Sequence, residues 1–197
     1  MTRKYLGLAA VAVLSALLGG CPGIIAPGSQ PYRPASDLEA QQRQAADFNI
    51  FPDDIRRDAE RYRGRTVAWA GIIRASKITK EPQGYRMDFT LEHRYFDWIE
   101  DDSIQRARFF VSPRGEGKFT TSWSMPPTTD EKALADAAAP GGLLVVYGRI
   151  AATAVKDGVI QIDADYLRPY PSWWYADDVM DYSRPGSPVK ILRVPMQ

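Results

Sequence analysis

Few side chains in this sequence are able to do covalent or acid–base chemistry. Its 197 residues include one cysteine, Cys21, and one histidine, His93. A thiolate is a nucleophile, so Cys21 is the residue suited to form a covalent bond with another molecule. Strand alternation places His93 on an inward face with Phe89 and Leu91, where a half-buried structural imidazole is expected rather than a general base. We therefore predict no catalytic residue and no enzymatic activity.

Metal and phosphate chemistry are disfavoured by residue type and spacing. One histidine and one cysteine are too few ligands for a zinc site. The acidic runs at 100–102 and 177–178 lack the spaced oxygen ligands of a calcium loop and are predicted to be solvated turns. Residues 115–118 lack the spacing of a phosphate-binding loop. We expect no metal, no cofactor and no disulfide.

Residues 1–20 have the pattern of an export signal. Arg3 and Lys4 precede an apolar run over residues 5–18, which is shorter than the about 20 residues that span a bilayer. The motif Leu18-Gly19-Gly20-Cys21 resembles the lipobox, the cleavage site of bacterial lipoprotein signal peptides. The resemblance implies cleavage before Cys21 and attachment of lipid, including palmitate, to the protein. The alternative is an ordinary signal peptide with a chance cysteine.

This resemblance also predicts a location and a membrane partner. The acyl chains on Cys21 would anchor the protein to a membrane of the bacterial cell envelope. Residue 22 is Pro rather than Asp, and an Asp there resembles the inner-membrane retention signal of enteric bacteria, so the outer membrane is favoured. Residues 21–35, rich in Pro, Gly and Ser, are predicted to be a flexible tether. With 25 basic and 24 acidic residues, neither the charge nor the export signal favours nucleic acid, and no nucleic-acid partner is expected.

The remaining chain divides by its hydrophobic period. Residues 36–63 are predicted to form two helices, one capped by Ser36 with Glu39 reaching back and one starting at Pro52. From 64 to 168 the period is two, which predicts a β domain. Its strands are expected at 65–74, 85–93, 106–112, 143–150 and 159–167, with an extension of the third strand to residue 123 left open. A connecting loop is expected at 94–105, and a helix capped by Thr128 at 128–138.

Three strands, a helix and a two-stranded hairpin follow the order of an OB-fold. We therefore expect a mainly β protein: a five-stranded OB-like antiparallel barrel, with N-terminal helices and an aromatic, Pro-rich C-terminal extension at 169–197. Gly71 and Gly148 in mid-strand suit the bends of a closed barrel. An open antiparallel sheet with helices on one face is the alternative.

Several segments resemble the starvation-inducible outer-membrane lipoprotein (Slp) family. In addition to the lipobox they are Tyr62-Arg63-Gly64-Arg65, residues 67–73, residues 144–150 and Trp173-Trp174. The resemblance implies an envelope lipoprotein with no catalytic residues to carry over.

Aromatic residues are the remaining candidates for binding. Rings stack on sugar faces, so a ligand-binding surface is predicted from Trp69, Tyr85, Tyr95, Trp98 and Trp123; the alternative is that they fill the barrel and anchor its loops. A partner or membrane interface is predicted from Trp173, Trp174 and Tyr175, with a clasp across the domain as the alternative. The sequence thus predicts a non-enzymatic envelope lipoprotein with a structural or partner-binding role. A module binding peptidoglycan or another oligosaccharide on the same anchor is the alternative.

Overall fold

A computed structural model describes residues 29–101, 109–115, 117–151 and 158–177. The described helices are α2 (Asp37–Ala45), α3 (Pro52–Arg57), α4 (Ala59–Tyr62), α5 (Glu131–Ala137) and the 3-10 helix η1 (Ser172–Trp174). The described strands are β1 (Ser29–Pro31), β2 (Thr66–Glu81), β3 (Gly84–Phe96), β4 (Ile99–Asp101), β5 (Phe109–Ser112), β6 (Lys118–Met125), β7 (Leu143–Ile150), β8 (Ile160–Tyr170) and β9 (Tyr175–Asp177). The predicted signal segment, Cys21, residues 22–28 of the tether and residues 178–197 lie outside the described part.

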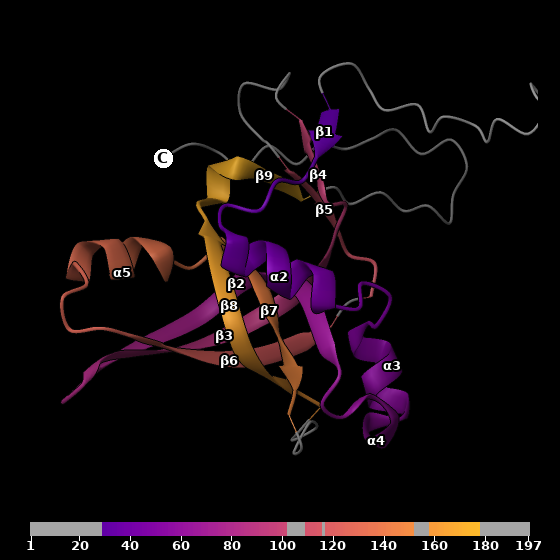
Figure 1. Ribbon diagram of the computed structural model, residues 1–197, viewed down its shortest axis with the longest axis horizontal. Helices are drawn as coiled ribbons and strands as arrows, with labels where there is room; N and C mark the ends of the chain where they lie inside the picture. Colours follow the sequence, from indigo (N-terminus) through magenta and orange to yellow (C-terminus); the bar gives the residue numbers. More distant parts are fainter. Residues whose placement is uncertain (1–28, 102–108, 116, 152–157, 178–197) are drawn as a thin grey trace, which may run out of the picture.

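Five strands close into a barrel, which confirms the predicted OB-like fold. Their order is β2-β7-β8-β6-β3, and β3 pairs back onto β2 (Figure 1). As expected, α5 falls between β6 and β7 in the chain, the third and fourth barrel strands. The pairing is antiparallel except between β6 and β8, which run parallel with Phe119 opposite Ile160. A closed ring of five strands cannot alternate direction throughout, so the expectation of a wholly antiparallel barrel is corrected at this one pair.

Alternation along the strands fills the barrel interior with apolar side chains. On β3, Met87, Phe89 and Leu91 are buried, whereas the residues between them are more exposed. Ile55 of α3 and Leu134 of α5 belong to the same core, and these helices lie on opposite sides of the barrel in Figure 1. The interior is therefore packed with side chains rather than open to a ligand.

A second core covers the outer face of β2, β7 and β8. Strand β7 is buried on both faces from Leu143 to Gly148. Helix α2 crosses this face, and β1, β4, β5 and β9 lie together at one end of it (Figure 1). The buried members of this core are mostly aromatic or aliphatic: Tyr32, Ala68, Ala70, Ile72, Phe96, Phe109, Val111, Leu143, Val145, Tyr147, Tyr170 and Tyr175. Two faces of one strand layer thus support two separate cores.

The middle of the chain is arranged differently from the prediction. The third barrel strand is β6, whereas β5 leaves the barrel to pair with the end of β3 and, in parallel, with β9. The loop predicted at 94–105 contains the end of β3 and strand β4, which pairs with β1. Helix α5 is capped by Asp130, whose carboxylate accepts from the Lys132 amide at 3.1 Å, rather than by Thr128. The differences in the strands arise because the partners of each strand lie far away in the sequence.

The tether is shorter than predicted. Tyr32 is 3% exposed in the second core, and its amide donates to the Trp98 carbonyl at 2.8 Å. Ser36 caps α2 as expected, accepting from the Glu39 amide at 3.1 Å. The second predicted helix is interrupted at Asp58, which separates α3 from α4. The predicted tether to residue 35 is therefore wrong from Tyr32 onward, because that segment packs on the barrel.

Candidate functional site

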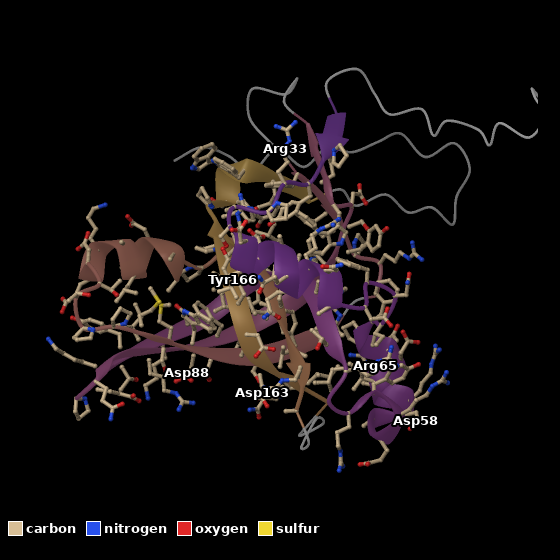
Figure 2. All side chains as sticks on the ribbon, viewed as in Figure 1. Arg33, Asp58, Arg65, Asp88, Asp163 and Tyr166 are labelled. Atoms are coloured by element: carbon tan, nitrogen blue, oxygen red, sulfur yellow. The ribbon has the colours of Figure 1, made fainter. Side chains whose placement is uncertain are left out.

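A polar groove of about 350 Å³ crosses the outer face of the barrel over β3 and β6. Its lining residues come from β2, β3, β6 and β8: Ala75, Ser76, Lys77, Arg86, Asp88, Phe89, Thr90, Thr120, Thr121, Ser122 and Gln161. Pairing brings them together, because Asp88 lies opposite both Lys77 and Ser122. Figure 2 shows Asp88 on the part of the barrel away from Arg33, which follows β1.

A hydrogen-bonded trio fixes the charged side of this groove. Ser122 Oγ donates to Asp88 Oδ1 at 2.6 Å, and Arg86 Nε donates to the same oxygen at 3.0 Å. Arg86 Nη2 also donates to Ser122 Oγ at 3.2 Å. The hydrogen bond from Ser122, followed by those with Arg86, holds the pKa of Asp88 below its usual value. The carboxylate is therefore ionised at neutral pH and is held in place by its neighbours.

The lining chemistry decides what kind of ligand the groove suits. It offers hydroxyls, an amide, two cationic side chains and one carboxylate. Among these described lining residues the aromatic one, Phe89, is 3% exposed because its ring points into the barrel. A ligand here would be held by hydrogen bonds and charge rather than by stacking on a ring.

Three of the five predicted ligand-binding aromatics belong to the barrel core or pack against it. Trp69 is 2% exposed, and its indole N–H donates to the Ile50 carbonyl at 2.8 Å. Tyr85 is buried, with its hydroxyl donating to Glu131 Oε1 at 2.8 Å. Trp123 is partly buried against this core. These rings close the interior of the barrel.

The other two aromatics lie outside the barrel and in different places. The Tyr95 ring is contacted by the Arg114 guanidinium, 4.9 Å from the ring centroid. Trp98 packs against the second core, its ring 5.2 Å from that of Tyr32, and has a φ of 57°. The structure therefore does not bring the five rings onto one surface. Alternation predicts which face of a strand a ring occupies, but not which loop or helix covers that face.

The three C-terminal aromatic residues, Trp173, Trp174 and Tyr175, differ in their burial. Tyr175 is 7% exposed, and its hydroxyl donates to the Gly141 carbonyl at 2.7 Å. Trp174 is partly buried, with its ring 6.4 Å from that of Phe109. Trp173 is 62% exposed. Tyr175 thus behaves as a clasp, and Trp173 projects from the surface.

His93 lies on the inward face of β3, as predicted, but it is fully buried rather than half-buried. It is 2% exposed, and its ring centroid lies 5.3 Å from that of Trp69 and 6.1 Å from that of Phe51. Burial lowers the pKa of the imidazole to about 3. Among the described residues, its Nδ1 has no hydrogen-bond partner. The ring is thus neutral and shielded from solvent.

A buried carboxylate that the sequence predicted only as part of a helix cap holds α2 to the barrel. Glu39 is 0% exposed and accepts hydrogen bonds from the hydroxyls of Tyr32 and Tyr147 and from Arg168 Nη1, the last at 3.1 Å. The Ala35 amide donates to it at 2.6 Å. Burial, the largest cause, raises the pKa of both tyrosines. The capping-box pattern marked Glu39, but local sequence contains no signal for its distant partners.

Two further observations concern the described residues alone. No group of three or more His, Cys, Asp or Glu side chains is placed there to hold a metal ion. In the same part of the chain, each helix is too short or too polar to cross a membrane.

Comparisons with known proteins add a distant structural likeness. No protein-family model and no curated protein matches the chain. A similar solved structure is the small single-stranded DNA-binding protein from Streptomyces coelicolor. That likeness has 18% identity and a TM-score of 0.32, and it covers 53% of this chain and 90% of that one.

This likeness corrects one expectation. No nucleic-acid partner was expected from the sequence, but a protein that resembles this chain in structure is a DNA-binding protein. That expectation does not stand. A likeness at this TM-score also assigns no ligand to this chain.

Proposed function

We propose that this protein is a non-enzymatic lipoprotein of the bacterial cell envelope that binds a partner through the polar groove on β3 and β6. The lipobox-like motif ending at Cys21 supports the anchor, and Pro22 after it favours the outer membrane. The observation that carries the binding role is the groove itself, in which Asp88, Arg86 and Ser122 are fixed by one another.

The state of His93 supports a role without catalysis. It is the single histidine of the sequence, and burial keeps its imidazole neutral and away from solvent. A general base must lie within hydrogen-bond reach of its substrate. The groove is therefore better suited to holding a ligand than to transforming one.

A glycan is the second candidate, favoured by the lining chemistry. Thr90, Thr120, Ser122 and Gln161 present hydroxyl and amide groups in one groove, and Asp88 adds an ionised acceptor. Sugars carry many hydroxyls that donate and accept hydrogen bonds. A peptidoglycan strand or another oligosaccharide therefore matches this surface.

The anchor is tested with the substitution Cys21→Ser. We expect the wild-type chain to be labelled by a palmitate analogue in growing bacteria and to fractionate with membranes. The Ser variant should remain unlabelled and either soluble or unprocessed, because the nucleophilic thiol is gone. An unlabelled wild-type chain would refute lipidation.

The groove is tested with a blocking substitution and a matched control. Thr120→Arg places a large side chain among the lining residues. Thr128→Arg makes the same change in the exposed turn before α5, outside the lining. The probe is purified peptidoglycan, and the readout is the fraction of protein that sediments with it. For a glycan-binding groove we expect Thr120→Arg to lower binding by about tenfold, which corresponds to roughly 1.4 kcal/mol, and Thr128→Arg to leave it unchanged.

The outcomes separate the two candidates. If Thr120→Arg leaves peptidoglycan binding unchanged, the groove does not bind the glycan. A protein crosslinked from position 120 in intact envelopes, with no peptidoglycan binding, would support a protein partner instead. If neither ligand depends on position 120, the groove is not the binding site.

A further inference from the structure

We infer that Trp173 docks one end of the folded body onto the phospholipid surface to which the chain is anchored. The inference rests on the proposed lipid anchor and commits to one occupant, the headgroup region of a bilayer. It assigns a membrane-facing end to the molecule, and it orients the polar groove away from the bilayer.

Trp173 is the most exposed large apolar side chain of the described residues. Its exposed fraction is 62%, compared with 49% for Leu38 and 40% for Ile78. The indole ring combines an apolar body with one N–H donor, which is why tryptophan gathers at membrane interfaces. An exposed tryptophan therefore suits the headgroup boundary of a bilayer.

The support beneath Trp173 is rigid. The Trp174 ring lies 5.4 Å from that of Trp173 and itself packs 5.7 Å from the Tyr170 ring. The Trp174 amide donates to the Pro171 carbonyl at 2.9 Å, which closes the turn of η1. The neighbouring Tyr175 is fixed to Gly141 by its hydroxyl. Trp173 is thus presented on an ordered base, so little backbone entropy is lost when it binds.

Trp173 lies at the end of the body where the chain from Cys21 arrives. Ring contacts lead from Tyr32 to Phe109 at 6.0 Å, from Phe109 to Trp174 at 6.4 Å, and from Trp174 to Trp173. Figure 1 shows β1 and β9 at this same end. Strand β1, with which the described chain begins, and the exposed indole are therefore on one side of the molecule.

The length of chain between Cys21 and the body limits its distance from the membrane. Residues 22–28 separate Cys21 from β1. Fully extended at about 3.5 Å per residue, the eight steps from Cys21 to Ser29 span roughly 28 Å. Because Tyr32 is buried in the second core, the residues from 32 onward add no slack. Such a short connection gives a high effective concentration of bilayer at this end, so one tryptophan with weak intrinsic affinity is enough for docking.

Docking through Trp173 has a consequence for the groove. Figure 2 shows Asp88, which lines the groove, on the part of the barrel away from Arg33 and β1. Contact at the β1 end therefore leaves the groove open to the aqueous compartment. A ligand in that compartment reaches the groove without competing with the membrane.

The test uses the mature lipidated protein extracted from bacterial membranes. It is reconstituted into vesicles of phosphatidylethanolamine and phosphatidylglycerol, with and without brominated acyl chains that quench nearby tryptophan fluorescence. Trp173→Phe removes the proposed fluorophore while keeping an aromatic ring. Trp123→Phe is the matched control, since Trp123 packs against the barrel core. We expect quenching of the wild-type protein, at least about twofold less quenching in Trp173→Phe, and no loss in Trp123→Phe.

The outcomes separate this inference from the proposed anchor. Co-sedimentation with vesicles reports the anchor and should be the same for wild type and both tryptophan variants. If the wild-type protein co-sediments but its fluorescence is not quenched, the docking role is overturned and the anchor stands. The same conclusion follows if the wild-type protein and Trp173→Phe are quenched equally. Protein that does not co-sediment defeats the anchor and this inference together. Shielding of Trp173 from a water-soluble quencher in native envelopes, without bromolipid quenching, would assign this end to a protein partner and overturn the inference.

Discussion

The environment of His93 determines its charge and therefore its contribution to stability. Its ring is enclosed by Trp69, Phe119 and Phe51, with ring centroids 5.3–6.4 Å away. Burial is the main cause that lowers the pKa of the imidazole to about 3, from an ordinary value of 6.5. The same burial that shields the ring from solvent makes the fold sensitive to acid.

We predict that protonation linked to His93 destabilises the fold as the pH falls from about 6.5 to about 3. In this window the unfolded chain binds a proton that the folded protein excludes, so the contribution is complete above pH 6.5 and is lost toward pH 3. At about 1.4 kcal/mol per pH unit, the loss amounts to roughly 3–5 kcal/mol. Urea unfolding at a series of pH values measures it. His93→Leu should show a shallower decline over the same window, whereas identical slopes would contradict the assignment.

Strand β7 shows how a single glycine permits a strand to join a closed barrel. Its register with β8 shifts between Tyr147 and Gly148. A Cβ on Gly148 would lie 2.8 Å from Ala164 Cα and would clash with the Asp163 carbonyl oxygen. The two backbones therefore approach too closely for any larger residue. This close approach of β7 and β8 explains why a glycine stands in mid-strand, and it agrees with the bend expected there.

We predict that Gly148→Val destabilises the protein by about 3 kcal/mol, because the new side chain meets backbone atoms that cannot move independently. On a flat strand the same change would be neutral or stabilising, since valine favours strands. The measurement is the urea midpoint, with Arg149→Val on the exposed face of β7 as the control. A midpoint for Gly148→Val equal to that of the control would show that the backbones are not in close contact.

At the scale of the whole molecule, the N-terminal segment is part of the folded body. Glu39 on α2 links this segment to β7 through Tyr147 and to β8 through Arg168. Arg168 Nη1 also donates to the Arg33 carbonyl at 3.0 Å. The ion pair of Glu39 with Arg168 therefore joins α2 directly to β8. The point at which the chain enters the barrel is therefore fixed by charge as well as by packing.

We predict that Glu39→Gln destabilises the protein by roughly 2–4 kcal/mol, because it leaves Arg168 without its anionic partner inside the fold. Glu60→Gln is the matched control: Glu60 pairs with Arg63 at an exposed position on α4, where such pairs contribute little. Urea unfolding of both variants gives the comparison. Loss of protection from proteolysis in residues 29–47 of Glu39→Gln alone would locate the effect. Equal midpoints for the two variants would contradict a role for Glu39 in docking α2.

The sequence by itself determined the order of the barrel elements. Alternation at 85–93, the apolar run at 143–150 and the helix between the third and fourth strands predict an OB-like topology, and the structure confirms it. The inward position of His93 was also predictable. These features are local, because hydrophobic period and turn residues are set by neighbours along the chain. Local patterns therefore suffice for the type and order of elements.

Only the tertiary structure decided which segments meet. Residues 109–112 and 118–125 have similar strand character, yet only the second enters the barrel, because β8 and β3 pair with it. The groove exists because Lys77, Asp88 and Ser122 come from three strands in register. Glu39 is bonded to Tyr147 and Arg168, which are 108 and 129 positions away. Such pairings depend on the closure of the whole barrel, and no local pattern encodes them.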